Sequence, residues 1–317
     1  MKSLLHRTLI VLLTAGVAAP AFAQSAAPAA SLALPGPVRV GPAKGRDYVR
    51  YIGDNKRGKL ETSIVTMKKG DMTVELVGAV HVADPEYYKA LSSLFTGYEV
   101  LLFELVDGQR LKDQVEGKAA KDNEDLGPAF KVIRGMMQGL GSYFRFQYQT
   151  DGIDYHAKNF VHADVSMDEF VNLQADKGES FATLIGRAME AQLDIGSTRE
   201  AEPKGSQLLL ALLGDSSGLK VAIAKQLAVA DELVAAMETG EGSVIISDRN
   251  KVALDVFARE TAAGRKNLGI FYGAAHLNDM EKRLEKQGYR RTGERWMTAW
   301  DIKPRADAKA TPVQPKE

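Results

Sequence analysis

Two segments near opposite ends of the chain carry the same short motif at the same offsets. Residues 78–84 read Gly-Ala-Val-His-Val-Ala-Asp, and residues 273–279 read Gly-Ala-Ala-His-Leu-Asn-Asp. Each motif follows an apolar stretch typical of a buried strand and precedes a helical pattern. Glycine permits a tight turn at the strand end, and the last Asp is suited to cap the next helix. Repeated strand–turn–helix units predict a single α/β domain with a central, mostly parallel mixed sheet covered by helices.

The other expected elements fit this fold class. A hairpin is expected over Leu60–Lys68 and Met72–Val77, with Lys69-Gly70-Asp71 at its turn. Residues 108–130 are of mixed polarity and are expected to form an insertion. Further strands are expected at Val100–Leu105, Leu268–Tyr272 and Arg295–Ile302. Helices are expected from Asp84-Pro85-Glu86 and over Phe181–Leu193, Leu219–Met237, Asp248–Ala263 and Asp279–Gln287.

The N-terminus has the pattern of an export signal. A basic start is followed by the apolar run Leu9–Ala18 and by the small-residue cleavage site Ala21-Phe22-Ala23. The apolar run is shorter than the roughly 20 residues that span a bilayer. We therefore expect residues 1–23 to be a signal peptide, and the mature protein to be periplasmic or secreted without a membrane span.

Composition bounds the rest of the chain. Residues 24–44 are predicted to be a flexible linker, residues 45–303 the folded domain, and residues 304–317 a disordered tail. Lys and Arg number 41 and Asp and Glu number 41, so the net charge gives no reason to expect a nucleic-acid partner. The absence of cysteine excludes thiolate nucleophiles, disulfides and Cys-ligated metals.

Four residues are candidates for a site. His81 and His276 follow the two strands, at the sheet edge where open α/β proteins bind ligands, and they converge if those strands are neighbours. Glu104 ends an apolar strand, and burial without a partner would be costly, so it should face solvent, a cation or a metal. Arg249 lies in the first turn of a helix, where it suits a carboxylate or an oxyanion. The alternatives are loop-capping histidines, a surface Glu and a solvated Arg.

The order of these motifs resembles that of the TraB/TIKI family, most closely its GumN-like bacterial branch. Phe271–Leu277 with Gly288-Tyr289 is similar to the family's C-terminal motif, and Asp151-Gly152-Ile153-Asp154 is similar to a mid-chain element. The resemblance covers about residues 60–300, but residues 164–169 lack an expected Leu-Glu-Thr-type element, which bears on substrate contacts.

The resemblance implies a fold of the wider erythromycin-esterase (EreA) and ChaN-like type and metal-dependent hydrolysis, with protease activity among animal members. It also implies a site made of His81, Glu104, Arg249 and His276.

Two versions of a hydrolytic site follow. In the first, His81, Glu104 and His276 hold one divalent ion (Mn, Co or Zn) that activates water, while Arg249 stabilises the intermediate. In the second, which needs no metal, His81 is a general base oriented by Glu104, and His276 or Arg249 serves the oxyanion. The expected substrate is a peptide or another small molecule.

A different class of function uses the same crevice. The chain would then be a non-catalytic periplasmic binding protein for haem, a metal or a peptide signal. His156 and His162 are six residues apart, which is not a helical ligand spacing, so loop positions are favoured over a second metal site. The aromatic cluster Tyr143, Phe144, Phe146 and Tyr148 is expected to pack in the core or on a hairpin face.

Overall fold

The computed structural model describes residues 47–106, 141, 143–179, 183, 216–229, 238 and 242–303. The predicted signal peptide, linker, insertion and C-terminal tail lie outside these residues. So do almost all of the helix expected over Phe181–Leu193 and the second half of the one expected over Leu219–Met237.

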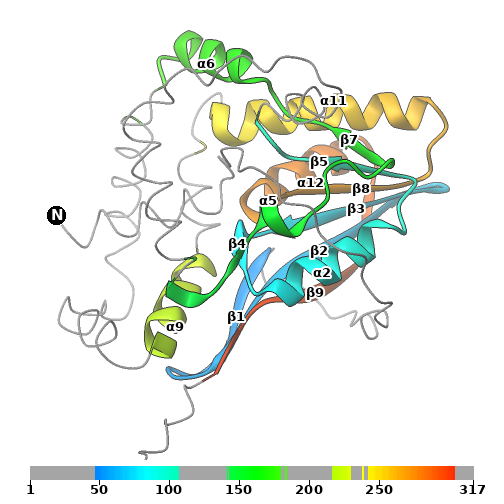
Figure 1. Cartoon of the computed structure of the whole chain (residues 1–317). Coiled ribbons are helices and arrows are strands. Elements are labelled where there is room, and N and C mark those ends of the chain that lie inside the picture. The colour runs from blue at the N-terminus through cyan, green and yellow to red at the C-terminus, as the bar shows by residue number, and fades with distance from the viewer. Residues whose placement is uncertain are drawn as a thin grey trace, which may run out of the picture.

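A mixed sheet forms the centre of the molecule, and the predicted α/β class is confirmed (Figure 1). Its path is β1-β2-β3-β8-β5-β7, and β9 pairs with β2. The pairs β3–β8, β8–β5 and β5–β7 are parallel, whereas those of β2 with β1, β3 and β9 are antiparallel. The strands of this sheet are β1 (Val49–Gly53), β2 (Gly58–Lys69), β3 (Met72–Ala79), β5 (Val100–Phe103), β7 (Phe160–His162), β8 (Asn267–Gly273) and β9 (Arg290–Ile302).

The predicted hairpin is present as β2 and β3. Lys69 pairs with Met72, so Gly70 and Asp71 form a two-residue turn. Gly70 has a φ of 60°, a value that glycine adopts without the steric cost that a side chain brings. A second, very short sheet joins β4 (Val82–Ala83) to β6 (Gln147–Tyr148) in antiparallel fashion.

Helices cover both faces of the sheet. In Figure 1, α2 lies on one side and α11 and α12 lie on the other. Phe95 of α2 packs on Phe271 of β8, with ring centroids 4.8 Å apart. The helices are α2 (Pro85–Phe95), α5 (Gln149–Gly152), α6 (Met167–Asp176), α9 (Ser216–Leu227), α11 (Arg249–Ala262) and α12 (Leu277–Lys286), with a π-helical turn η2 (Val244–Asp248) and a 3-10 turn η3 (Ala274–His276).

Two expected helix caps are wrong. Asp84 precedes α2, but its carboxylate accepts a hydrogen bond from the backbone N–H of Asp301 at 2.6 Å and does not cap the helix. Asp279 lies inside α12, where it pairs with Arg283. Asp84 therefore bonds to a residue distant in sequence, and Asp279 to a residue one helical turn away, in place of the capping hydrogen bond.

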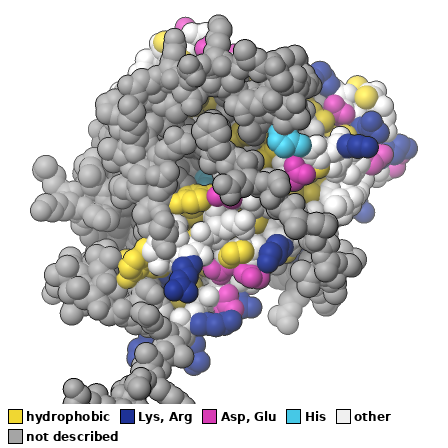
Figure 2. All heavy atoms as spheres, viewed as in Figure 1, with side chains coloured by type: hydrophobic (Ala, Val, Ile, Leu, Met, Phe, Trp, Pro, Cys, Tyr) yellow, Lys and Arg dark blue, Asp and Glu magenta, His cyan; other side chains and the backbone are white. Residues whose placement is uncertain are grey.

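The described surface mixes charges of both signs. On the face shown in Figure 2, Lys and Arg side chains alternate with Asp and Glu side chains. Within the described ranges, no helix combines the length and the apolar character needed to cross a membrane.

Glu75 of β3 ties together the antiparallel half of the sheet. It accepts hydrogen bonds from Arg295 through both guanidinium NH2 groups at 2.5 Å, from Tyr98 at 2.5 Å and from Thr66 at 2.9 Å. Burial alone would raise the pKa of Glu75, but the bonds from Arg295 and Tyr98 outweigh it and lower the pKa below its usual value. A carboxyl whose folded-state pKa is lowered stabilises the fold at neutral pH, and this contribution is lost as the pH falls.

We therefore expect Glu75→Gln to lower the free energy of unfolding by about 2 kcal/mol at pH 7, and by much less at pH 3. Urea denaturation at the two pH values measures this. Glu86→Gln, on the exposed side of α2, is the matched control and should change stability little at either pH. Equal losses for Glu75→Gln at both pH values would contradict the role given to its charge.

Candidate functional site

The four candidate residues follow neighbouring strands or face them. Ala79 of β3 pairs with Gly273 of β8, and Phe103 of β5 pairs with Phe271 of β8. His81, His276 and Glu104 therefore leave three adjacent parallel strands at the same edge of the sheet. The strands before His81 and His276 are thus neighbours, which is the condition for these two side chains to converge.

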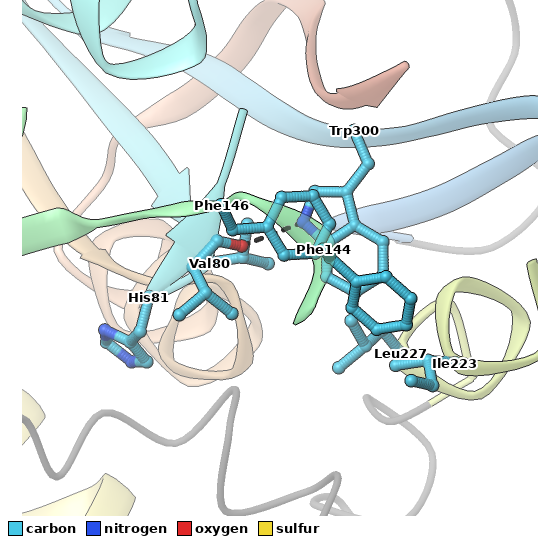
Figure 3. Close-up of a pocket in the computed structure, with 8 residues that line it drawn as sticks. Val80, His81, Phe144, Phe146, Ile223, Leu227 and Trp300 are labelled. Atoms are coloured by element: carbon cyan, nitrogen blue, oxygen red, sulfur yellow. Dashed lines mark hydrogen bonds between the residues drawn. The ribbon is translucent and has the colours of Figure 1, made fainter. Parts of the chain in front are cut away.

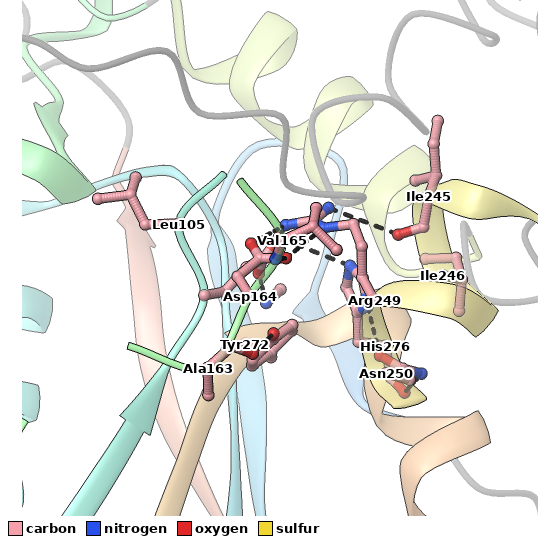
Figure 4. A network of polar contacts seen from close by, with 12 residues as sticks. Leu105, Ala163, Asp164, Val165, Ile245, Ile246, Arg249, Asn250, Tyr272 and His276 are labelled. Atoms are coloured by element: carbon pink, nitrogen blue, oxygen red, sulfur yellow. Dashed lines mark hydrogen bonds and ion pairs between the residues drawn. The ribbon is translucent and has the colours of Figure 1, made fainter. Parts of the chain in front are cut away.

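Arg249 is the centre of a buried ion cluster. Its side chain is fully buried, and Nε and Nη2 donate to the two carboxylate oxygens of Asp164 at 2.9 and 2.7 Å. Nη2 also donates to Oε1 of Glu104 at 2.6 Å. Figure 4 shows Arg249 reaching from α11 to Asp164, which lies just after β7. The alternative of a solvated helix arginine is wrong.

The turn before α11 sets the position of this arginine. The side chain of Ser243 accepts a hydrogen bond from the backbone N–H of Ile246 at 3.1 Å and starts the π-helical turn η2. A π-turn holds an extra residue and is often found at functional sites. Here it also places the carbonyl of Ile245 3.4 Å from Nη1 of Arg249.

Glu104 joins the cluster to strand β8. Its Oε2 accepts a hydrogen bond from the backbone N–H of Gly273 at 2.5 Å, while Oε1 faces Arg249. Burial raises the pKa of Glu104 to about 7, helped by the negative charge of Asp164 and opposed by Arg249. A carboxyl group with such a pKa can give or take a proton near neutral pH.

His276 is oriented by Asn250. The Asn250 amide Nδ2 donates to the His276 carbonyl at 3.1 Å and to Asp279 at 2.9 Å, so its Oδ1 accepts from Nδ1 of the ring at 2.6 Å. We infer from this network that Nδ1 carries a proton and that Nε2 is the nitrogen facing Oε1 of Glu104, 3.6 Å away. Figure 4 shows Asn250 beside this ring.

His81 differs from the other three residues. Its side chain is buried, yet within the described part of the chain neither ring nitrogen makes a hydrogen bond of normal geometry. Burial, together with the charge of Arg249, lowers the pKa of His81 to about 4, and the nearby Gln149 side chain opposes this only in part. The ring is therefore neutral at neutral pH and offers one N–H donor and one lone pair.

Sequence reasoning missed Asp164 and Gln149. Asp164 follows the short strand β7 as Glu104 follows β5, and a carboxylate at a strand end is the signal that could have found it. Gln149 starts α5, and no motif marks it. His162 bonds the carbonyl of Leu105 at 2.8 Å, and His156 is exposed, so the structure brings neither into the cluster.

The predicted three-ligand metal centre does not fit this arrangement. Both oxygens of Glu104 are engaged, one by the Arg249 cation and the other by the Gly273 N–H. Within the described part of the chain, no three His, Asp or Glu side chains are grouped so as to hold one ion. A divalent ion at Glu104 would have to share this carboxylate with the guanidinium cation.

Comparisons with protein-family models, with curated proteins and with solved structures give no match for this chain. The TraB/TIKI resemblance therefore stays a prediction.

We expect Arg249→Met to lower the free energy of unfolding by about 3–5 kcal/mol at pH 8, because it leaves Glu104 and Asp164 buried without their cation. At pH 5.5 the loss should be smaller, because Glu104 then takes up a proton. Urea denaturation at both pH values measures the difference. Arg50→Met removes a half-exposed pair with Glu61 and should cost about 1 kcal/mol or less. A loss for Arg249→Met no larger than this control would show that the cluster does not hold the site together.

Proposed function

We propose that the chain is an exported hydrolase that cleaves peptide bonds at the carboxyl edge of its parallel strands. The observation that carries this proposal is the buried, unpartnered imidazole of His81 beside the network of Glu104, Arg249 and His276. Groups with shifted pKa values that gather at one edge of an α/β sheet are typical of acid–base sites. Export is proposed from the signal pattern of residues 1–23.

The exposed fractions of the four side chains suggest different roles for them. His81 is 6% exposed, Glu104 3%, and Arg249 and His276 are fully buried. We assign His81 to the substrate: its lone pair accepts a proton from the attacking water as the oxygen bonds to the carbonyl carbon. Glu104, next to His276, is the proton source for the departing nitrogen. Arg249 is a positioning residue, because its bonds to Asp164 and Glu104 hold the acid in place.

The test is hydrolysis of a peptide library and an ester panel by the mature protein. His81→Ala should lower kcat/KM by roughly 100-fold or more, the size of a lost general base. His156→Ala replaces an exposed loop histidine and should retain full activity. Circular dichroism and urea midpoints establish that both variants fold. Full activity in a folded His81→Ala would contradict the proposal.

Metal dependence is tested separately. The expectation of Mn, Co or Zn at His81, Glu104 and His276 requires one divalent ion per purified molecule and its loss in His81→Ala. The contacts of Glu104 with Arg249 and Gly273 instead favour activity that withstands chelators. Elemental analysis of the mature protein and assays after EDTA treatment separate these outcomes.

A second candidate is a non-catalytic binding protein, favoured by the apolar lining of the pocket beside His81; haem would need this pocket to widen far beyond its present size. In that case the imidazole would be an axial ligand for haem, or would contact a captured metal or peptide signal. A Soret band on haem titration that His81→Ala abolishes, with no turnover of any peptide, would establish this alternative. Pull-down of an uncleaved peptide would do the same for the peptide signal.

A further inference from the structure

An apolar pocket adjoins His81. Its walls come from segments outside the parallel strands: the residues before β6, the helix α9 and the strand β9 (Figure 3). His81 stands at one end of this row of residues and Ile223 at the other. The walls include Val82, Phe144, Phe146, Leu227 and Trp300.

The walls present almost no unsatisfied polar group. The indole N–H of Trp300 donates to the carbonyl of Val82 at 2.8 Å, so the ring shows the pocket only its apolar surface. Phe146 lies against this ring with centroids 4.6 Å apart. The cavity is narrow as the side chains lie, with a volume of about 10 Å³, so a side chain that enters must push the lining residues apart. The apolar lining favours an aliphatic group over a polar one.

Polar atoms that lack a hydrogen-bond partner in the described structure lie beside this apolar lining, on His81 and on the neighbouring Gln149. The backbone N–H of Gln149 donates to the carbonyl of His81 at 2.9 Å, which fixes the two residues side by side. The Gln149 Nε2 donates to Tyr155 at 2.9 Å, but its buried Oε1, like both ring nitrogens of His81, has no hydrogen-bond partner among the residues that the structure describes. Each buried polar atom left unpaired costs about 1–3 kcal/mol unless a ligand or water satisfies it.

A peptide group matches these three atoms. Its N–H suits the Gln149 acceptor, its carbonyl suits the N–H of the neutral His81 ring, and the attacking water suits the remaining lone pair. We propose that the pocket binds an aliphatic side chain of a peptide substrate while Gln149 and His81 bind the adjacent peptide group. This inference rests on the proposed peptide hydrolysis and adds Gln149 as a substrate-contacting residue.

Binding can be measured without cleavage. The chain has two tryptophans, so Trp296→Phe leaves Trp300 as the single fluorophore, in the pocket wall. In this background, N-acetyl-leucinamide should shift the Trp300 emission saturably. N-acetyl-alaninamide should bind roughly tenfold more weakly or worse, because it buries three fewer carbons. N-acetyl-glutaminamide, of similar length but polar, should also bind more weakly. Equal affinities for the three amides would overturn the proposal.

Variants test the two halves of the pocket. Leu227→Phe and, as a second filling variant, Val80→Leu, at another residue of the pocket wall, should remove the preference for the leucine amide. Gln149→Leu should weaken its binding about tenfold. The variant also removes the hydrogen-bond donor to Tyr155, so its urea midpoint should fall modestly. Gln147→Leu, two residues earlier on β6, is the control and should bind as the parent does. Unchanged binding in Gln149→Leu, or an unchanged preference in both folded filling variants, would refute the assignment.

The outcomes for pocket and function are distinguishable. Selective binding of the leucine amide without cleavage of any peptide would refute hydrolysis and leave the pocket standing. Cleavage of the peptide library with no preference for an aliphatic residue at any position would refute the pocket and leave the hydrolase standing.

Discussion

The ion cluster around Arg249 is the constraint on which the edge of the sheet depends. One cation faces two buried carboxylates, Asp164 after β7 and Glu104 after β5, and Glu104 also accepts the N–H of Gly273 at the end of β8. Because an ion left alone in this interior would cost several kcal/mol, three strand ends and the helix α11 are fixed relative to one another. Two carboxylates face a single arginine, which leaves an excess of negative charge. This excess is one reason why the pKa of Glu104 is high.

The two polar regions at this edge differ in how far they are satisfied. In the cluster, the described hydrogen bonds run without a break from Asp164 through Arg249 and Glu104 to the backbone of β8. At His81 and Gln149, three buried polar atoms have no hydrogen-bond partner among the residues described. A fold that pairs every polar group in one hydrogen-bond network but leaves polar atoms unpaired in the next loses stability at the unpaired atoms. Such a cost is typical of atoms that a ligand satisfies.

Much of the fold could be predicted from the sequence, because its signals are local. Apolar runs and the Gly70 turn gave the hairpin and the buried strands, and the repeated glycine–histidine turn indicated one sheet edge. The Asp84 and Asp279 caps were wrong because Asp301 and Asn250, distant in sequence, offer these carboxylates other hydrogen bonds. Asp164 was missed because the three-residue strand β7 is too short to show a periodicity, and its partner lies 85 positions away.

The short β4–β6 pairing explains why the site has separable parts. Val82 pairs with Tyr148. The same segment supplies Phe146 to the pocket and, directly after Tyr148, places Gln149 against the His81 carbonyl. The ion cluster draws on none of these residues, since its members follow the parallel strands and begin α11. Changes in the residues before β6, in α9 or at Trp300 can therefore alter what the pocket accepts while Arg249 and its carboxylates stay in place. Under the proposed function, the sheet holds the reacting group, and the segments packed against the sheet set the selectivity.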